Sequence, residues 1–131
     1  MSYIDEVWDE RSPNAVSRFA APGFRRHLSA ISQPLDLEGQ ITRVRGFQSA
    51  FPDVTVTVED VAADGDLIAF RSTMRGTHRG EVLGIPPTGK RVEVGLLDLI
   101  RVVDGQFAEQ WGGPDMLDLV RQLGGSITTG V

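Results

Sequence analysis

The spacing of the apolar residues changes part-way along this 131-residue chain, and this change limits the folds open to it. Before Pro52, apolar residues recur every three or four positions, and residues 35–51 read as an amphipathic helix of about four turns. After Pro52 the pattern alternates with period two, beginning with Val54, Val56 and Val58, as is typical of half-buried strands. Helices followed by an antiparallel meander predict an α+β fold. The helices would cover one face of a curved sheet, whose cone-shaped mouth is a natural ligand site.

The remaining elements follow from the same periodicities and from turn residues. Asp64-Gly65-Asp66 and Asp104-Gly105 are turn sequences, and the second predicts a tight hairpin. Further helices are expected over residues 3–8, from Pro13 to Pro22-Gly23, and from Pro114 to about Leu123; further strands are expected over residues 24–28, 67–78, 91–103 and 106–111.

Composition and charge restrict the class of protein. Hydrophobic residues make up 40% and charged residues 24%, as in ordinary globular domains. The formal net charge of −5 argues against nucleic acid or an anionic membrane surface as a partner. No apolar run suits a membrane span, and acidic residues near the start argue against a signal peptide, so a cytoplasmic location is expected. We expect one domain over residues 1–124 and a flexible tail over 125–131.

The common metal and phosphate motifs are missing from the sequence. The absence of cysteine excludes disulfides and thiolate metal sites. His27 and His78 have no metal-ligand spacing with the carboxylates, so we expect no metal site. The glycines between residues 76 and 89 fit no phosphate loop, and no nucleophile elbow is present. Arg43 and Arg45 are expected on a solvated helix face.

Asp98 interrupts the more apolar face of the predicted strand 91–103. That face also carries Ile100, whereas the opposite face carries Leu97 and Leu99. Burying a carboxylate among aliphatic side chains is costly unless the group is paired, or else its pKa rises. A raised pKa suits a general acid or a hydrogen-bond donor to an oxyanion. Alternatively, Asp98 lies at a rim or pairs with an arginine such as Arg71 or Arg101.

Trp111 and Asp115 each allow a functional and a structural interpretation. By alternation, Trp111 shares a face with Phe107 and Glu109, and it either lines a pocket or closes the core. Asp115 follows Pro114 in the first turn of the final helix, where an acidic side chain favours the helix dipole whatever its chemistry.

Motifs over most of the chain resemble those of the SnoaL-like polyketide cyclases of the NTF2-like superfamily. They are Ala50-Phe51-Pro52-Asp53, Gly76-Thr77-His78-Arg79-Gly80, Pro87-Thr88-Gly89-Lys90, Arg101-Val102-Val103-Asp104-Gly105, Glu109-Gln110-Trp111 with Asp115, and Gln122-Leu123-Gly124, together with His27. The resemblance implies a cone-shaped barrel, usually a homodimer, that works without a cofactor. It also implies ring closure by intramolecular aldol condensation, with Asp115 by motif position as general acid/base. This chain has Gln110 where the family often has histidine.

A more distant resemblance is to the ketosteroid isomerases of the same superfamily. Leu97-Asp98-Leu99-Ile100-Arg101 is similar to the strand that carries their protonated, oxyanion-binding aspartate. Tyr3 and His27 are spaced like that family's tyrosine donor and aspartate base, and Trp111 falls at the position of a pocket tryptophan. Because His27 stands where a carboxylate should act as base, the resemblance indicates which positions face the pocket rather than steroid isomerisation.

The sequence therefore predicts a small cofactor-independent enzyme that performs aldol-type cyclisation, or a related proton transfer, on a polyketide-like carbonyl compound. The predicted catalytic residues are Asp115, Asp98 and His27, and the predicted substrate-binding residues are Tyr3, Phe19, Phe51, Ile100, Glu109 and Trp111. The expected partners are an apolar small molecule and a second copy of the chain, through the face of Leu97 and Leu99. Alternatives are an isomerase, epoxide hydrolase or dehydratase of the superfamily, a non-catalytic binding module, or an interaction domain.

Overall fold

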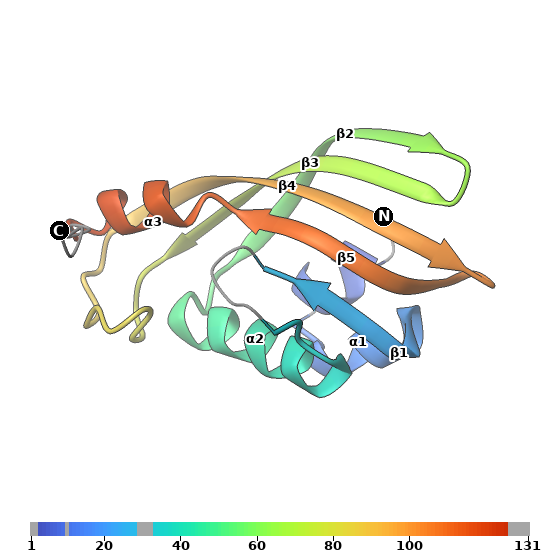
Figure 1. The fold of residues 1–131 in the computed structure, drawn as a ribbon. Helices are drawn as coiled ribbons and strands as arrows, with labels where there is room; N and C mark the ends of the chain where they lie inside the picture. Colours follow the sequence, from blue (N-terminus) through green and yellow to red (C-terminus); the bar gives the residue numbers. More distant parts are fainter. Residues whose placement is uncertain (1–2, 10, 29–32, 126–131) are drawn as a thin grey trace, which may run out of the picture.

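A five-stranded mixed sheet organises the protein (Figure 1). The computed structural model describes residues 3–9, 11–28 and 33–125. The strands are β1 (Ala20–His27), β2 (Thr55–Asp64), β3 (Leu67–Thr77), β4 (Arg91–Val103) and β5 (Gln106–Pro114). Their order across the sheet is β1-β5-β4-β3-β2, with β1 parallel to β5 and every other neighbouring pair antiparallel. The predicted α+β architecture is confirmed.

The helices lie mainly against one face of this sheet, as Figure 1 shows for α1 and α2. They are the π-helix η1 (Ile4–Asp9), the 3₁₀-helix η2 (Pro13–Ala15), α1 (Val16–Phe19), α2 (Leu37–Ala50) and α3 (Met116–Gln122). The main hydrophobic core fills the space between these helices and the sheet. Among the described residues, no helix is long and apolar enough to cross a membrane.

Helix α2 forms where the apolar spacing predicts it. The Asp36 side chain caps its start by accepting a hydrogen bond from the Gly39 backbone N–H at 2.8 Å. The apolar stripe that includes Val44 and Phe47 is buried, and Pro52 follows soon after the last turn. This long helix therefore presents one face to the sheet and helps to enclose the space between them.

Two predicted boundaries are wrong. The helix expected to run to Pro22-Gly23 ends at Phe19, because Ala20 is already extended and pairs with Phe107 of β5. Pro22 is accommodated where the register between β1 and β5 shifts. Similarly, Pro114 does not begin the final helix; it ends β5, and α3 starts at Met116.

A bulge at Ala108 changes which side of β5 the side chains occupy. Arg101 of β4 pairs with Glu109, whereas the next residue of β4 pairs with Phe107, so Ala108 is the extra residue. Phe107 consequently packs on the helix-covered face, with its ring 5.3 Å from that of Tyr3. Glu109 lies on the opposite face. The expectation that Phe107 shares a face with Glu109 and Trp111 is therefore wrong.

The expectation of one domain over 1–124 stays a prediction, and residues 126–131 of the expected tail lie outside the described residues. The homodimer and the cytoplasmic location also stay predictions. Leu97 and Leu99 are exposed on the expected face, at 65% and 37% of their accessible area.

Replacing Gly112 by alanine is expected to destabilise the fold. Gly112 has a φ of +92°, and a Cβ there would lie 2.1 Å from the Leu97 carbonyl oxygen. We expect Gly112→Ala to lower the free energy of unfolding by more than about 1 kcal/mol, because both the φ and the space exclude a side chain. The matched control Gly95→Ala, with open space around its Cβ, should change it by less than about 0.5 kcal/mol. Urea unfolding measures both, and equal losses would contradict the expectation.

Candidate active site

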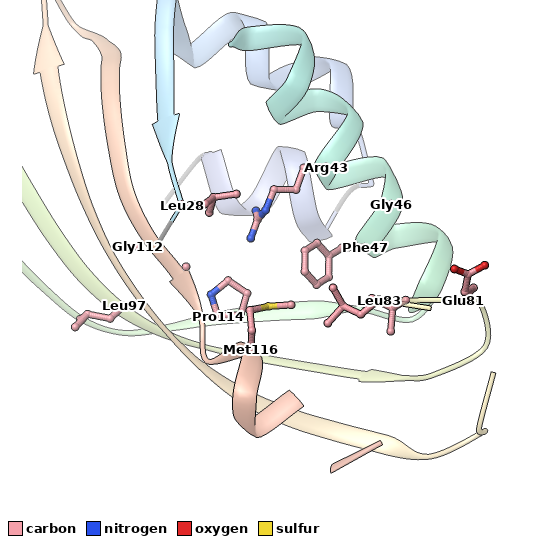
Figure 2. A pocket seen from close by; sticks show the side chains of 12 residues that line it. Leu28, Arg43, Gly46, Phe47, Glu81, Leu83, Leu97, Gly112, Pro114 and Met116 are labelled. Carbon is pink, nitrogen blue, oxygen red and sulfur yellow. The ribbon is translucent and has the colours of Figure 1, made fainter. Parts of the chain in front are cut away.

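A cavity of about 580 Å³ lies between α2 and the end of β5 (Figure 2). Its wall is completed by the chain after β1, the loop after β3 and the start of α3. The lining residues are Leu28, Arg43, Gly46, Phe47, Glu81, Val82, Leu83, Leu97, Gly112, Gly113, Pro114 and Met116. Most of these present apolar atoms, and the cavity is large enough for a drug-sized organic molecule.

Arg43 places a positive charge in this mainly apolar wall. Its side chain and that of Phe47 extend from α2 into the cavity, as Figure 2 shows, with the guanidinium carbon 5.0 Å from the Phe47 ring centre. Burial, together with the like charge of Arg26, lowers the pKa of Arg43 to about 10, so the group remains cationic at neutral pH. The expected solvated face is thus wrong for Arg43, whereas Arg45 is exposed and donates to Asn14 Oδ1 at 2.6 Å.

Behind Arg43 lies a buried polar cluster centred on Asp98, which is only 4% exposed. Asp98 Oδ1 accepts hydrogen bonds from Arg26 Nη2 and from Gln110 Nε2, both at 3.1 Å. Burial raises the pKa of Asp98, and the nearby Arg26, Gln110 and Arg43 oppose that rise. Arg26 Nη2 also donates to the Gly112 carbonyl oxygen at 3.0 Å, so the cluster is tied to the cavity wall.

The cluster borders a small inner void of about 20 Å³, of which Arg43 is also a lining residue. Tyr3 and Gln40 face this void, and Gln40 Nε2 donates to the Tyr3 hydroxyl at 3.5 Å. Burial raises the pKa of Tyr3. Four buried atoms here have no hydrogen-bond partner among the described residues: Arg26 Nε, Gln40 Oε1, Ser72 Oγ and Gln110 Oε1. A polar void of this size has room for one water molecule.

The structure brings Asp98 and Tyr3 together at the inner void, as the isomerase resemblance implies for pocket-facing positions. Asp115 lies elsewhere. It is exposed and caps α3, with Oδ1 accepting from the Asp118 backbone N–H at 3.0 Å. Asp115 is not itself a lining residue of the main cavity, although its neighbours in the chain, Pro114 and Met116, are.

His27, Glu109 and Trp111 also come together, but on the other face of the sheet. His27 Nε2 lies 2.9 Å from Glu109 Oε2, and the His27 ring stacks on Trp111 with centres 5.2 Å apart. Because Arg26 points inward from β1, the next residue, His27, points outward. The structure therefore places these three predicted site residues away from the main cavity.

The other predicted wall residues belong to the core or its edge. Phe51 and Ile100 are at most 1% exposed, and the Phe51 ring lies 5.6 Å from that of His78. Phe19 packs edge-on against the Tyr3 ring, with centres 5.6 Å apart. None of the three is a lining residue of the main cavity within the described part of the chain.

Sequence reasoning missed the residues that surround Asp98. The partners considered for it, Arg71 and Arg101, lie on the exposed face and pair with Asp60 and Asp66 instead. The signal that found Asp98, a polar residue on an apolar face, also marks others. Arg26 follows Phe24 on β1, Ser72 stands between Phe70 and Met74 on β3, and Gln40 precedes Val44 on α2.

Metal ligation finds no support in this arrangement. In residues 3–9, 11–28 and 33–125, no group of three or more His, Cys, Asp or Glu side chains could hold a metal ion.

Comparison with known proteins identifies the family. The family model described as SnoaL-like polyketide cyclase matches residues 1–123. The chain belongs to the SnoaL-like polyketide cyclase family. The aklanonic acid methyl ester cyclase DauD of Streptomyces sp. (strain C5) is 36% identical over 118 residues, which cover 88% of this chain and 71% of DauD. The aklanonic acid methyl ester cyclase DnrD of Streptomyces peucetius is 36% identical over 61 residues, 47% of this chain and 42% of DnrD.

The solved structures agree with this assignment. IdmH from Streptomyces antibioticus is 34% identical and superposes with a TM-score of 0.81, covering 94% of each chain. The predicted family and its NTF2-like fold are therefore confirmed. Because the named relatives of this SnoaL-like protein are cyclases, an enzyme of the cyclase type is confirmed at the level of the family.

Replacing Arg26 by methionine should destabilise the protein strongly at neutral pH. The change leaves the Asp98 carboxylate buried without its ion-pair partner, which costs about 3–5 kcal/mol of unfolding free energy. The loss should shrink as the pH falls, because protonation of Asp98 removes the buried charge. Arg71→Met is the matched control: its pair with Asp60 is exposed, so at most about 1 kcal/mol should be lost. Similar losses in urea unfolding of both variants would refute the expectation.

Asp98 and Asp53 should titrate on opposite sides of the ordinary aspartate pKa of about 3.9. Burial raises the pKa of Asp98, whereas hydrogen bonds from the Thr77 backbone N–H and hydroxyl, each 2.7 Å, lower that of Asp53. The contribution of Asp98 to the free energy of unfolding is therefore fully present at low pH and is lost as the pH rises through the pKa that Asp98 has in the folded protein. The contribution of Asp53 to the free energy of unfolding is lost as the pH falls through the pKa that Asp53 has in the folded protein. Carboxyl ¹³C NMR, assigned with Asp98→Asn and Asp53→Asn, tests this; an Asp98 pKa at or below 3.9 would contradict it.

Proposed function

We propose that this chain closes a ring in a polyketide-like carbonyl substrate by intramolecular aldol addition, without a cofactor. The observation that carries the proposal is the 580 Å³ cavity, whose lining is mainly apolar and which is lined by Pro114 and Met116, the two residues on either side of Asp115 in the chain. The relatives named as aklanonic and nogalonic acid methyl ester cyclases support the substrate class.

The shape and polarity of the cavity suit this reaction. Ring closure requires a flexible chain to bring two of its own carbon atoms together, and holding them in place removes much of the entropic barrier. Apolar walls such as Phe47, Pro114 and Met116 would fold such a chain and exclude water from the reacting carbons.

Asp115 is the proposed general acid/base. Its Oδ1 is held by the helix cap, and its Oδ2 has no hydrogen-bond partner in the part of the chain that the structure describes. The carboxylate would remove a proton from the carbon next to one carbonyl group. That carbon would then bond to a second carbonyl carbon, and the new alkoxide would recover the proton from Asp115. Substrate and product are isomers, and proton transfer of this kind contributes about 10²–10⁴-fold.

Asp98 is proposed as a positioning residue rather than a proton carrier. It lies behind Arg43, and both hydrogen bonds to its Oδ1 come from protein groups. Its role would be to hold Arg26, and through the Gly112 carbonyl the end of β5, in place.

An epoxide hydrolase of the same superfamily differs from a cyclase because it adds water to its substrate. An epoxide hydrolase needs an arginine between two aspartates, whereas within the described chain Arg26 pairs with the carboxylate of Asp98 alone. Ring closure leaves the mass unchanged and takes up no ¹⁸O from labelled water. Hydrolysis adds one water and its label.

Asp115→Asn should lower kcat for ring closure by about 10²-fold or more while leaving the fold intact. Asparagine caps a helix as well as aspartate does, so the variant removes only the proton-transfer group. Asp118→Asn is the matched control on the same helix and should retain activity, since its backbone N–H is unchanged. The assay separates aklanonic or nogalonic acid methyl ester from its isomeric product by liquid chromatography and identifies both by mass spectrometry. Undiminished turnover by the Asp115→Asn variant would exclude Asp115 as the acid/base. If the wild-type protein forms no product of unchanged mass from either ester, that result would count against the proposed reaction.

A further inference from the structure

The guanidinium of Arg43 lacks an anionic partner among the described residues. No hydrogen bond or ion pair from its nitrogen atoms to another described residue is formed, although the side chain is half-buried in the cavity wall. Arg26, by contrast, donates hydrogen bonds to Asp98 Oδ1 and to the Gly112 carbonyl oxygen. The Phe47 ring contacts the flat face of the Arg43 guanidinium and leaves the guanidinium N–H groups available.

Both guanidinium groups approach the same point on β5. A Cβ placed on Gly113 would lie 3.1 Å from Arg26 Nη2 and 3.5 Å from Arg43 Nη2. Gly113 is a lining residue of the main cavity, and as glycine it leaves this point open. Because Gly113 has no side chain, the cavity wall is open beside it, next to the Nη2 atom of Arg43.

The charges around this position do not cancel. Arg26 and Arg43 together carry two positive charges, and Asp98 supplies at most one negative charge. Glu81, the other charged lining residue, is exposed, and Figure 2 shows it away from Arg43, beyond Phe47 and Leu83. At least one positive charge thus remains uncompensated in a partly dehydrated wall, where an anion would interact more strongly than in water.

We propose that Arg43, beside Gly113, forms an anion subsite for the polar end of an otherwise apolar ligand. The ligand class is a planar anion with two oxygen atoms, such as a carboxylate or an enolised 1,3-dicarbonyl group, because a guanidinium binds two such oxygens with paired N–H groups. The inference rests on the proposed function in one respect: the enolate formed during ring closure is the anion that the subsite would hold.

Binding of a simple aromatic anion tests the subsite without any turnover. The probes are 2-naphthoate and its neutral counterpart 2-naphthamide, which have the same rings and differ in charge. Isothermal titration calorimetry at pH 7 should show that 2-naphthoate binds the wild-type protein at least about tenfold more tightly than the amide, as expected for a charge-assisted hydrogen-bonded pair.

Three variants assign the difference to Arg43. Arg43→Gln should abolish the preference for the anion while leaving 2-naphthamide binding within about twofold, which also shows that the cavity remains folded. Arg43→Lys should retain part of the preference, because the charge stays but the paired N–H geometry is lost. Arg45→Gln, on the same helix but exposed, is the matched control and should bind both probes like the wild type.

Two results would overturn the proposal. One is equal affinity of the wild-type protein for the two probes, or no detectable binding of 2-naphthoate. The other is an equal loss of preference in Arg43→Gln and Arg45→Gln, which would point to general surface charge. Since naphthoate undergoes no ring closure, failure of the subsite is distinguishable from failure of the proposed reaction, which the Asp115→Asn assay tests.

Discussion

The buried ion pair between Arg26 and Asp98 connects parts of the sheet that are not adjacent. Arg26 lies on β1 and Asp98 on β4, with β5 between them. Gln110 of β5 donates to the same Asp98 oxygen, and Arg26 reaches the Gly112 carbonyl, so one cluster joins three strands. A carboxylate this deep is tolerated only with such partners. The placement of β1 relative to β4, and of Gly112 in the cavity wall, therefore depends on this cluster.

The cavity lies where β5 departs from regular strand geometry. Gly112 and Gly113 both have positive φ, and the Gly112 backbone approaches the Leu97 carbonyl so closely that no side chain fits. After this bend, Pro114 lines the wall and Asp115 caps the start of α3. Arg43 faces the same bend from α2. Backbone geometry that only glycine allows thus sets the path of β5 along the cavity wall.

Local patterns predicted much of this arrangement. The strand 91–103 and the burial of Asp98 followed from alternation, and α2 followed from helical spacing. These patterns did not predict that Arg26 is the ion-pair partner of Asp98. Arg26 is 72 residues away in the sequence, and it comes close to Asp98 only when β1 adds to the edge of the sheet. The side on which Trp111 lies was equally out of reach, since one extra residue at Ala108 reverses the alternation.

The sequence by itself determined the elements and the family, because periodicity, turn residues and motifs are local properties of the chain. It also identified Asp98, since a carboxylate on an apolar strand face stands out without any fold. Only the tertiary structure decided that Arg43 enters the cavity while Arg45 remains in solvent, and that His27 and Trp111 turn away from it. Those outcomes depend on the pairing register of distant strands and on the packing of α2 against the sheet, and neither is encoded in any one segment.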